Sequence, residues 1–440
     1  MSVRSIPCWR KVLAVRHPDA MEAYLRQVLQ QIRWKRARTV IGQELQNHLE
    51  DQYQAFLEEG LPPTEAEAET VRQMGDPVSV GKALDALHRP RREWSFLWLA
   101  LLLLGCGILL SLANAGFQWN RIFQARLGCA VIGLVLGVLL YFWDGKLLCD
   151  RPVLLAVLLG LVPLFARRFY SSSFDLTFDQ GLLLLPLAMG LMVCAMRGHG
   201  WRGISACLQL EFLLILDCIQ AKSFYFTCFI FLFCLFLLLK QAAGDPVPQS
   251  RKLGMVLIVG FHIAAVAVFW LLRGALSSFL PVNSSEFGAA SLPYQIFWGS
   301  RWFSSDVTTL SPSQLSLLQD RFALTWLARQ YGMIVVVLLV GIVLLFLARG
   351  FRICQRQGSP LGGDCGRSIL SALAFESLGY FAQCMIGLPG AHFFLPLVDT
   401  SGPALVVELA LIGLLLGLFR QNTLLEARQL HHWFLGEAVC

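Results

Sequence analysis

The feature that most constrains the fold is a succession of apolar spans that begins at Trp94 and fills most of the chain. A membrane-spanning helix needs ~20 apolar residues. One connection, residues 273–320, is several times longer than its neighbours. We therefore expect an all-α polytopic membrane protein in which this loop meets a polar compartment. The ten spans are expected at 94–115, 126–143, 152–167, 181–197, 203–219, 223–240, 253–272, 322–348, 368–388 and 403–420.

The composition agrees and shows where the chain divides. The sequence is 56% hydrophobic and 15% charged, which is typical of a membrane protein. Residues 1–93 hold 14 of the 36 Lys and Arg and 13 of the 29 Asp and Glu, an ordinary soluble composition. No basic block is dense enough for nucleic acid, so that partner is excluded. We expect a helical domain at 1–92, a membrane domain at 93–421 and a tail at 422–440.

The N-terminal domain is expected to form three or four short helices, because apolar residues recur at helical spacing from Met21 onward. Gly60 is expected to end the second helix. The pattern Thr64-Glu65-Ala66-Glu67 predicts a capping box at the start of the third. Asp76-Pro77 predicts an N-cap and a first-turn proline for the fourth.

The termini are predicted to lie in the cytoplasm. The first 18 residues are basic and lack the apolar segment of a cleavable signal peptide. Arg89, Arg91 and Arg92 abut the first span and hold its start inside. An even number of spans returns the C-terminus to the same side, which places the long loop outside.

The 13 cysteines are scattered, and most lie inside apolar spans. No Cys-x-x-Cys pair occurs and the long loop has no cysteine, which argues against a disulfide framework or a zinc site. Ionisable residues inside spans are costly, so each is a candidate for function. We expect them to face the interior and to pair with backbone or with each other, in preference to a transport path; they are Glu211, Asp217, His262, Glu376 and Glu408.

Residues 20–90 resemble the permease-prefix or HAAS-type helical domain that precedes many bacterial membrane proteins. The resemblance implies a bacterial source and a regulatory or docking role. It is carried by Glu44-Leu45-x-x-His48-Leu49-Glu50-Asp51, by Glu59-Gly60 and by Met74-Gly75-Asp76-Pro77.

Residues 95–420 resemble the SEDS family of bacterial cell-wall synthesis, the relatives of RodA, FtsW and SpoVE. That family has ten spans, a large outer loop between spans seven and eight, and both ends inside. Four stretches carry the resemblance: Arg126-Leu127 with the exit Phe142-Trp143-Asp144-Gly145-Lys146; Asp320-Arg321-Phe322-Ala323-Leu324 through Gly332 to Arg349; Pro360-Leu361-Gly362 with Gly366-Arg367; and Leu388-Pro389 with Leu395-Pro396-Leu397-Val398 and Gly402.

The resemblance implies a glycosyltransferase that polymerises lipid II, or acts on another undecaprenyl-linked substrate, beside a penicillin-binding-protein-like partner in the bacterial plasma membrane. Asp320 maps to the family's base, which fits the need of a sugar hydroxyl for an activating carboxylate. A pyrophosphate leaving group needs cations. No cofactor is certain, a divalent cation is left open, and no metal ligand is assigned. The substrate-binding candidates are Arg126, Arg168, Trp298, Arg301, Arg321, Pro396, Asp399 and Gly402.

Alternatives stay open at this point. Asp320 precedes an apolar run, so it also fits a plain helix N-cap. The family's Gln-Pro-Ser-Glu motif is absent near residues 178–181. The chain is therefore either a divergent glycosyltransferase or a non-catalytic scaffold that regulates wall enzymes through its prefix domain; transport of a lipid-linked precursor is a weaker third reading. Elongation, division and sporulation are not distinguished.

Overall fold

The computed structural model is all-helical over the residues that it describes, with no strand among them. The chain divides into two compact units, Met1–Arg91 with Arg420–Cys440 and Arg92–Phe419. Each unit is described by itself below. The described residues are 19–88, 93–143, 185–196, 205, 207–215, 224–244, 256, 259–264, 267–268, 271, 285–303, 310–311, 314–315, 318–319, 322–357, 360–387, 393–398 and 402–421.

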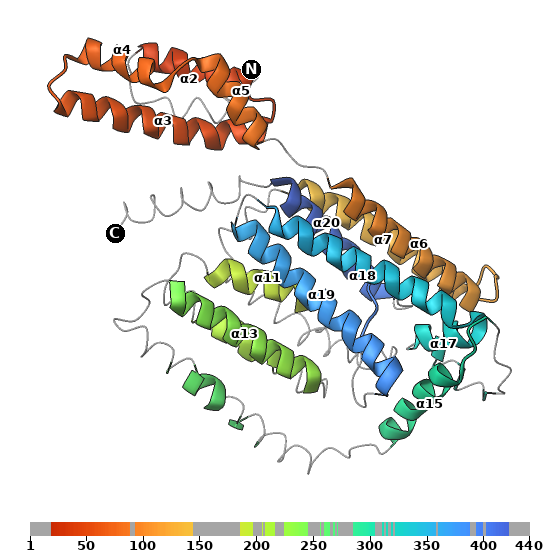
Figure 1. The fold of residues 1–440 in the computed structure, drawn as a ribbon. Coiled ribbons are helices and arrows are strands. Elements are labelled where there is room, and N and C mark those ends of the chain that lie inside the picture. The colour runs from red at the N-terminus through yellow and green to blue at the C-terminus, as the bar shows by residue number, and fades with distance from the viewer. Residues whose placement is uncertain are drawn as a thin grey trace, which may run out of the picture. The chain divides into compact units, whose positions relative to one another are not determined.

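In the first unit, residues 19–88 form four helices around an apolar core of their own (Figure 1). The predicted helical periodicity is confirmed, because the residues that recur at helical spacing are the ones that meet in this core. Met21, Tyr24, Leu25, Val28, Leu45 and Leu49 are all buried there. The helices are α2 (Asp19–Gln31), α3 (Lys35–Glu58), α4 (Pro63–Met74) and α5 (Pro77–His88).

Two of the three predicted helix boundaries in this unit are confirmed. Gly60 follows α3 with φ of +90°, a conformation that suits glycine. Asp76 caps α5, since its Oδ2 accepts a hydrogen bond from the Ser79 amide at 2.9 Å. The predicted capping box is wrong: α4 begins at Pro63, one residue before Thr64, because a proline suits the first helical position. Glu67 instead accepts a hydrogen bond from the amide of Ala20 at 2.7 Å.

The second unit is a membrane domain. Four helices among the described residues are long and apolar enough to cross a membrane; they lie in α6 (Trp94–Asn114), α7 (Arg121–Phe142), α18 (Met333–Gln355) and α19 (Pro360–Ile386). Figure 1 shows α18 between α6 and α19. The shorter apolar helix α11 (Leu185–Met196) packs on α19, and α13 (Phe224–Gly244) contacts α11.

The last of the described helices, α20 (Gly402–Gln421), crosses α7 at very close range. A Cβ on Gly413 would lie 2.1 Å from the Gly137 carbonyl oxygen, so both helices need glycine at the crossing. Small residues that bring two backbones together are a common way of joining helices in a membrane. Phe419 also packs edge-on against Phe96 of α6, which ties the end of α20 to the start of α6.

The helix predicted at 322–348 is wrong in one respect, because it is broken at Gly332. A short helix α17 (Ala323–Tyr331) comes first, and α18 starts at Met333. Gly332 has φ of +91°, and the amides of Met333 and Ile334 donate to the carbonyls of Arg301 and Trp302 at 3.0 and 3.3 Å. The long loop therefore takes over the hydrogen bonds that α17 would have supplied to the start of α18.

Two further boundaries differ from prediction. The stretch 360–367 was expected to be a loop, but it is helical and forms the first turns of α19. The long connection 273–320 contains a helix of its own, α15 (Ser285–Gly299), which packs against α17 and α19. The span predicted at 152–167 lies outside the described residues.

Candidate functional site

The predicted site residues fall into two sets. Four lie outside the part of the chain that the structure describes: Asp320, Arg168, Arg321 and Asp399. Five are described: Arg126, Trp298, Arg301, Pro396 and Gly402. The described five form two groups, one around Arg126 inside the helix bundle and one at the end of α15.

Arg126 lies inside α7 and not at its start. The helix begins at Arg121, earlier than predicted, because Asn120 caps it by accepting a hydrogen bond from the Phe123 amide at 2.8 Å. The side chain of Arg126 is only 3% exposed. Its Nη2 donates to the carbonyl of Val398 at 3.1 Å. An arginine predicted to hold a pyrophosphate is therefore bound to the main chain of a distant segment.

That segment, residues 393–398, is buried throughout and contains the predicted site residue Pro396. Leu397 has φ of +64°, which is strained for a leucine and costs of order 1–3 kcal/mol. Its amide donates to Oε2 of Glu408 on α20 at 2.7 Å. Adjacent backbone groups of this segment are thus held by an arginine from α7 and a carboxylate from α20.

A second buried carboxylate stands near the first. Glu376 on α19 is 2% exposed and Glu408 is 4% exposed, and the two lie close enough to repel each other when charged. We call Arg126, Glu376, Glu408 and the backbone of Leu397 and Val398 the buried polar cluster. Charged side chains are costly inside a membrane domain, so a cluster of buried ionisable groups marks a candidate site.

Three of the five ionisable residues that were predicted to pair inside the spans do so. Glu408 pairs with backbone, and Glu211 pairs with His262 at 3.2 Å between Oε1 and Nε2. Glu376 is buried close to Glu408. Asp217 lies outside the described residues. The sequence analysis singled out Glu376 and Glu408 as acids within apolar runs, but it assigned neither to the functional site. An acid within an apolar run was the signal that could have placed them there.

Two glycines allow the elements around Arg126 to approach each other. A Cβ on Gly107 of α6 would lie 2.2 Å from the Leu397 carbonyl oxygen and 3.0 Å from Arg126 Nη2. A Cβ on Gly402 would lie 2.9 Å from the sulfur of Cys129, one turn beyond Arg126 on α7. Gly402 therefore serves close helix packing beside the cluster.

The second group lies where α15 meets α19. Trp298 is 62% exposed, and its Nε1 donates to the carbonyl of Met385 at 2.8 Å. Arg301 is exposed, and its carbonyl accepts the Met333 amide. Trp302 is also exposed, so this end of the unit presents aromatic and cationic side chains together. Such a rim fits either an interface belt or a surface that binds sugars and phosphates.

The residue before Asp320 is tied to the same end of the bundle. The side-chain amide of Asn114, the last residue of α6, donates to the carbonyl of Gln319 at 3.4 Å. Phe322, two residues after Asp320, donates its amide N–H to the carbonyl of Leu318 at 3.0 Å. Asp320 itself is not described, but Gln319, the residue before it, is anchored at the end of α6.

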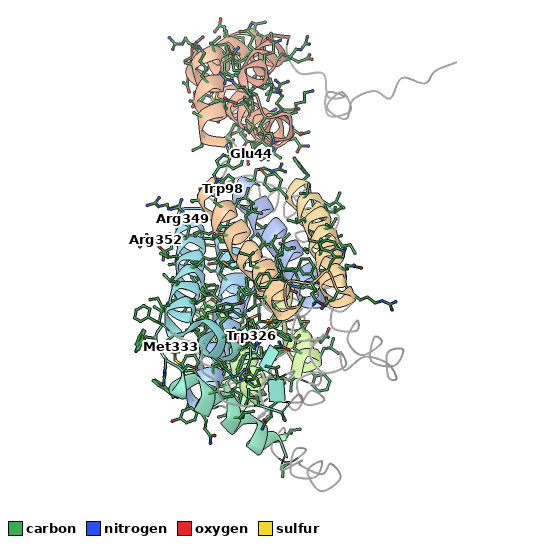
Figure 2. All side chains as sticks on the ribbon, turned by 90° about the vertical axis from the view of Figure 1, so that its right-hand side faces the viewer. Glu44, Trp98, Trp326, Met333, Arg349 and Arg352 are labelled. Atoms are coloured by element: carbon green, nitrogen blue, oxygen red, sulfur yellow. The ribbon has the colours of Figure 1, made fainter. Side chains whose placement is uncertain are left out.

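Charges mark the opposite end of the membrane domain. Arg349 of α18 donates to Ser95 Oγ at 2.7 Å and pairs with Glu93 at 3.2 Å. Lys240 and Arg367 both pair with Asp364 at the start of α19. Figure 2 shows Trp98, Arg349 and Arg352 at this end, with Trp326 and Met333 at the other.

No family model and no curated protein matches the sequence. Solved structures do match. One is a chain of the structure titled "Structural coordination of polymerization and crosslinking by a peptidoglycan synthase complex", with a TM-score of 0.53, 18% identity, and coverage of 76% of this chain and 98% of that chain. Two others are of the Thermus thermophilus rod shape determining protein RodA, one of them a mutant, with TM-scores of 0.44 and 0.46 at the same identity and coverage.

The first of these likenesses shows a shared fold. The predicted fold class, an all-helical polytopic membrane protein, is thereby confirmed. At 18% identity the likeness is one of fold alone. The match covers 98% of the other chain and 76% of this one, so it extends over most of the fold and not over a few helices.

Proposed function

We propose that the protein is a SEDS-like membrane protein of bacterial cell-wall synthesis that polymerises lipid II as a divergent peptidoglycan glycosyltransferase. The observation that carries the proposal is the fold shared with a chain of a peptidoglycan synthase complex over 98% of that chain. A penicillin-binding-protein-like partner is proposed on the same ground. Membrane location is supported by the four apolar helices of spanning length.

The charge distribution supports an orientation. Arg349, Arg352 and Lys240 lie at the end where α6 begins and α13 and α18 finish. Basic residues are enriched on the cytoplasmic side of bacterial membrane proteins. This end is proposed to face the cytoplasm, with the N-terminal unit and the C-terminal tail on the same side. The end with Trp298 and Arg301 then faces the cell-wall compartment.

The proposed chemistry takes place at that outer end. Asp320 is proposed as the base that removes a proton from the attacking sugar hydroxyl, a role that requires a carboxylate within hydrogen-bond reach. Arg301, Arg321 and Arg168 are proposed to stabilise the pyrophosphate as its charge grows. Trp298 offers an exposed ring on which a sugar can stack.

Arg126 is given a different role by its contacts. Its guanidinium is buried and bound to the Val398 carbonyl, so it is proposed to position the 393–398 segment and not to bind substrate directly. Pro396 and Gly402 belong to the same positioning assembly. The segment lies just before Asp399, which keeps its proposed place among the substrate-binding residues.

A polymerisation assay tests this function. The full-length protein, purified in detergent, is incubated with fluorescently labelled lipid II, with and without a purified penicillin-binding partner from the same organism. The expected product is a ladder of glycan strands on a denaturing gel. Adding a chelator tests the divalent cation that the sequence left open. Failure to form strands under every partner condition contradicts the proposed enzyme.

One observation favours a second function, a non-catalytic scaffold that regulates wall enzymes. The four-helix unit α2–α5 is compact and has its own core, as expected of a module that docks a partner. Deleting residues 1–92 separates the two functions. If the protein is a scaffold, neither the full-length protein nor the deletion variant polymerises lipid II, and the deletion abolishes the protein's effect in cells. If the protein is an enzyme, the deletion variant still polymerises lipid II in vitro.

A further inference from the structure

Three buried side chains that can bind metal come together in the membrane domain, and the thiol of a fourth, Cys207, lies beside one of them. Cys207 and Glu211 lie one turn apart on the helical residues 207–215, so they share a helix face. Cys234 comes from α13, and His262 comes from the helical residues 259–264. All four are at most 4% exposed. Three stretches of the chain thus contribute to a single cluster.

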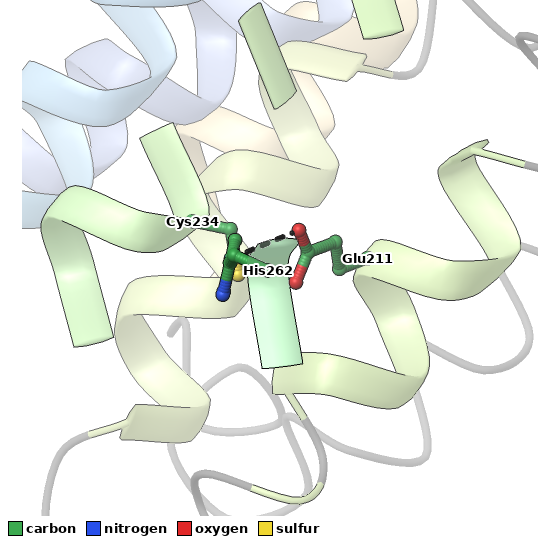
Figure 3. Close-up of side chains that lie close together, drawn as sticks. All are labelled: Glu211, Cys234 and His262. Atoms are coloured by element: carbon green, nitrogen blue, oxygen red, sulfur yellow. Dashed lines mark ion pairs between the residues drawn. The ribbon is translucent and has the colours of Figure 1, made fainter. Parts of the chain in front are cut away.

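The functional atoms of these side chains point toward one another. Figure 3 shows Glu211, Cys234 and His262 converging. One ligand atom from each of these three lies within 4.8 Å of the others. The sulfur of Cys207 is 3.8 Å from that of Cys234, and His262 Nε2 is 3.2 Å from Glu211 Oε1.

Two of these separations, the S···S and the N···O distances, match edges of a tetrahedral zinc site. Zinc binds sulfur at about 2.3 Å and nitrogen or oxygen at about 2.0–2.2 Å, so a tetrahedron has S···S edges of about 3.8 Å and N···O edges of about 3.4 Å. The observed 3.8 and 3.2 Å agree with both edges. A disulfide would require about 2.0 Å between the sulfurs, which the pair does not have.

The chemistry of the set selects the metal. Two thiolates, one imidazole and one carboxylate are borderline-soft ligands that suit zinc, and four protein ligands make a closed, structural site. A divalent cation would also stabilise the buried Glu211 carboxylate, because a charged group in an apolar interior is costly unless it is paired or binds a metal. Phe231 and Phe261 pack against the His262 ring, so the surroundings are apolar.

We propose that Glu211, Cys234 and His262 bind a structural zinc ion, that the neighbouring thiol of Cys207 turns in as the fourth ligand, and that the site holds three helical segments of the membrane domain together. The scattered cysteine spacing argued against zinc, because no two of the four ligands form a familiar short motif. The site is visible only when three separate segments are brought together in space.

Zinc stoichiometry in the full-length protein tests the proposal. Protein purified in detergent under reducing conditions is incubated with zinc chloride, freed of excess by gel filtration, and analysed by elemental mass spectrometry. The expected content is one zinc per chain for the wild type and at least a tenfold loss for the double variant Cys207→Ser/Cys234→Ser. Cys354→Ser is the matched control, because Cys354 is equally buried on α18 and should leave the zinc in place.

A second measurement does not depend on how a variant folds. Wild-type protein loaded with cobalt chloride in place of zinc should show the visible bands of tetrahedral Co(II) and a near-ultraviolet thiolate-to-cobalt charge-transfer band. Both signals should disappear when zinc is added in excess. Three results overturn the proposal: a cobalt spectrum without the thiolate band, the same zinc content in the wild type and a monodisperse double variant, or a Cys207–Cys234 disulfide found by mass spectrometry in protein that binds no metal.

Discussion

Arg126 and Val398 are 272 positions apart in sequence, yet the guanidinium of the first donates to the carbonyl of the second at 3.1 Å. The contact joins α7 to the buried segment that leads into α20. Glu408 holds the neighbouring Leu397 amide from the other side. Arg126 therefore holds the 393–398 segment in place. This contact predicts effects of mutations on stability that can be tested without an assay of activity.

Arg126→Ala should destabilise the membrane domain. The change removes a charged donor from a buried carbonyl, and hydrogen bonds that involve a charged group contribute about 1.5–3 kcal/mol. Thermal unfolding of the detergent-purified protein should show a lower midpoint. Arg121→Ala is the control, because Arg121 is exposed at the start of the same helix. Equal midpoints for the two variants would show that the Val398 contact adds nothing to stability.

Gly107→Ala should be more harmful than Gly105→Ala, although both lie in the middle of α6. A Cβ at Gly107 would meet the Leu397 carbonyl oxygen at 2.2 Å, whereas one at Gly105 meets nothing within 4 Å. Overpacking of this kind typically costs about 1–3 kcal/mol. Gly105→Ala should be neutral or slightly stabilising by the same thermal measurement. If the two variants behave alike, α6 does not press on the 393–398 segment as described.

The N-terminal unit should lose stability in acid partly through Asp76. The hydrogen bond from the Ser79 amide holds the pKa of Asp76 below its ordinary value. A carboxylate with a lowered pKa stabilises the fold above its unfolded pKa of about 3.9 and stops doing so as the pH falls through the folded value. Urea unfolding of residues 19–92, followed by circular dichroism, should show Asp76→Ala to be less stable at pH 7.

The same difference should shrink when the measurement is repeated at pH 3, because protonation removes the charged cap from the wild type as well. Asp51→Ala is the control, since Asp51 is exposed in the interior of α3. A gap between wild type and Asp76→Ala that stays constant from pH 7 to pH 3 would contradict the cap as a charged group.

The proposed orientation predicts which residues can be labelled from outside the cell. Phe303→Cys, at an 83% exposed position beyond α15, should react with a membrane-impermeant maleimide on intact cells. Gln355→Cys, exposed at the end of α18, should react only after lysis. The unmodified protein measures the background from the native cysteines. The reverse pattern would place the basic end outside and would remove Asp320 from the cell-wall side.

Local signals in the sequence predicted local structure well. Gly60 and Asp76 act through neighbours a few residues away, so their roles as helix stop and helix cap could be predicted. The break at Gly332 could not, because the apolar run continues through it. That break depends on the carbonyls of Arg301 and Trp302, which a sequence pattern does not reveal.

The candidate site shows the same limit. The acids inside spans could be flagged because charge in an apolar run is conspicuous, and Glu408 is indeed buried against backbone. The partner of Arg126 could not be predicted, because a main-chain carbonyl leaves no trace in the sequence. Cys207, Cys234 and His262 come from three separate stretches, so their meeting is a property of the tertiary fold.

The most direct measurement compares the rate of lipid II polymerisation by the wild type, Asp320→Asn and Asp306→Asn in the presence of the penicillin-binding partner. Removing a general base typically slows a reaction about 10²–10⁴-fold. Asp320→Asn should therefore lose nearly all activity while keeping the wild-type unfolding midpoint, and Asp306→Asn, an acid from the same loop, should polymerise normally. Wild-type rates for Asp320→Asn would contradict the assignment of this carboxylate as the base.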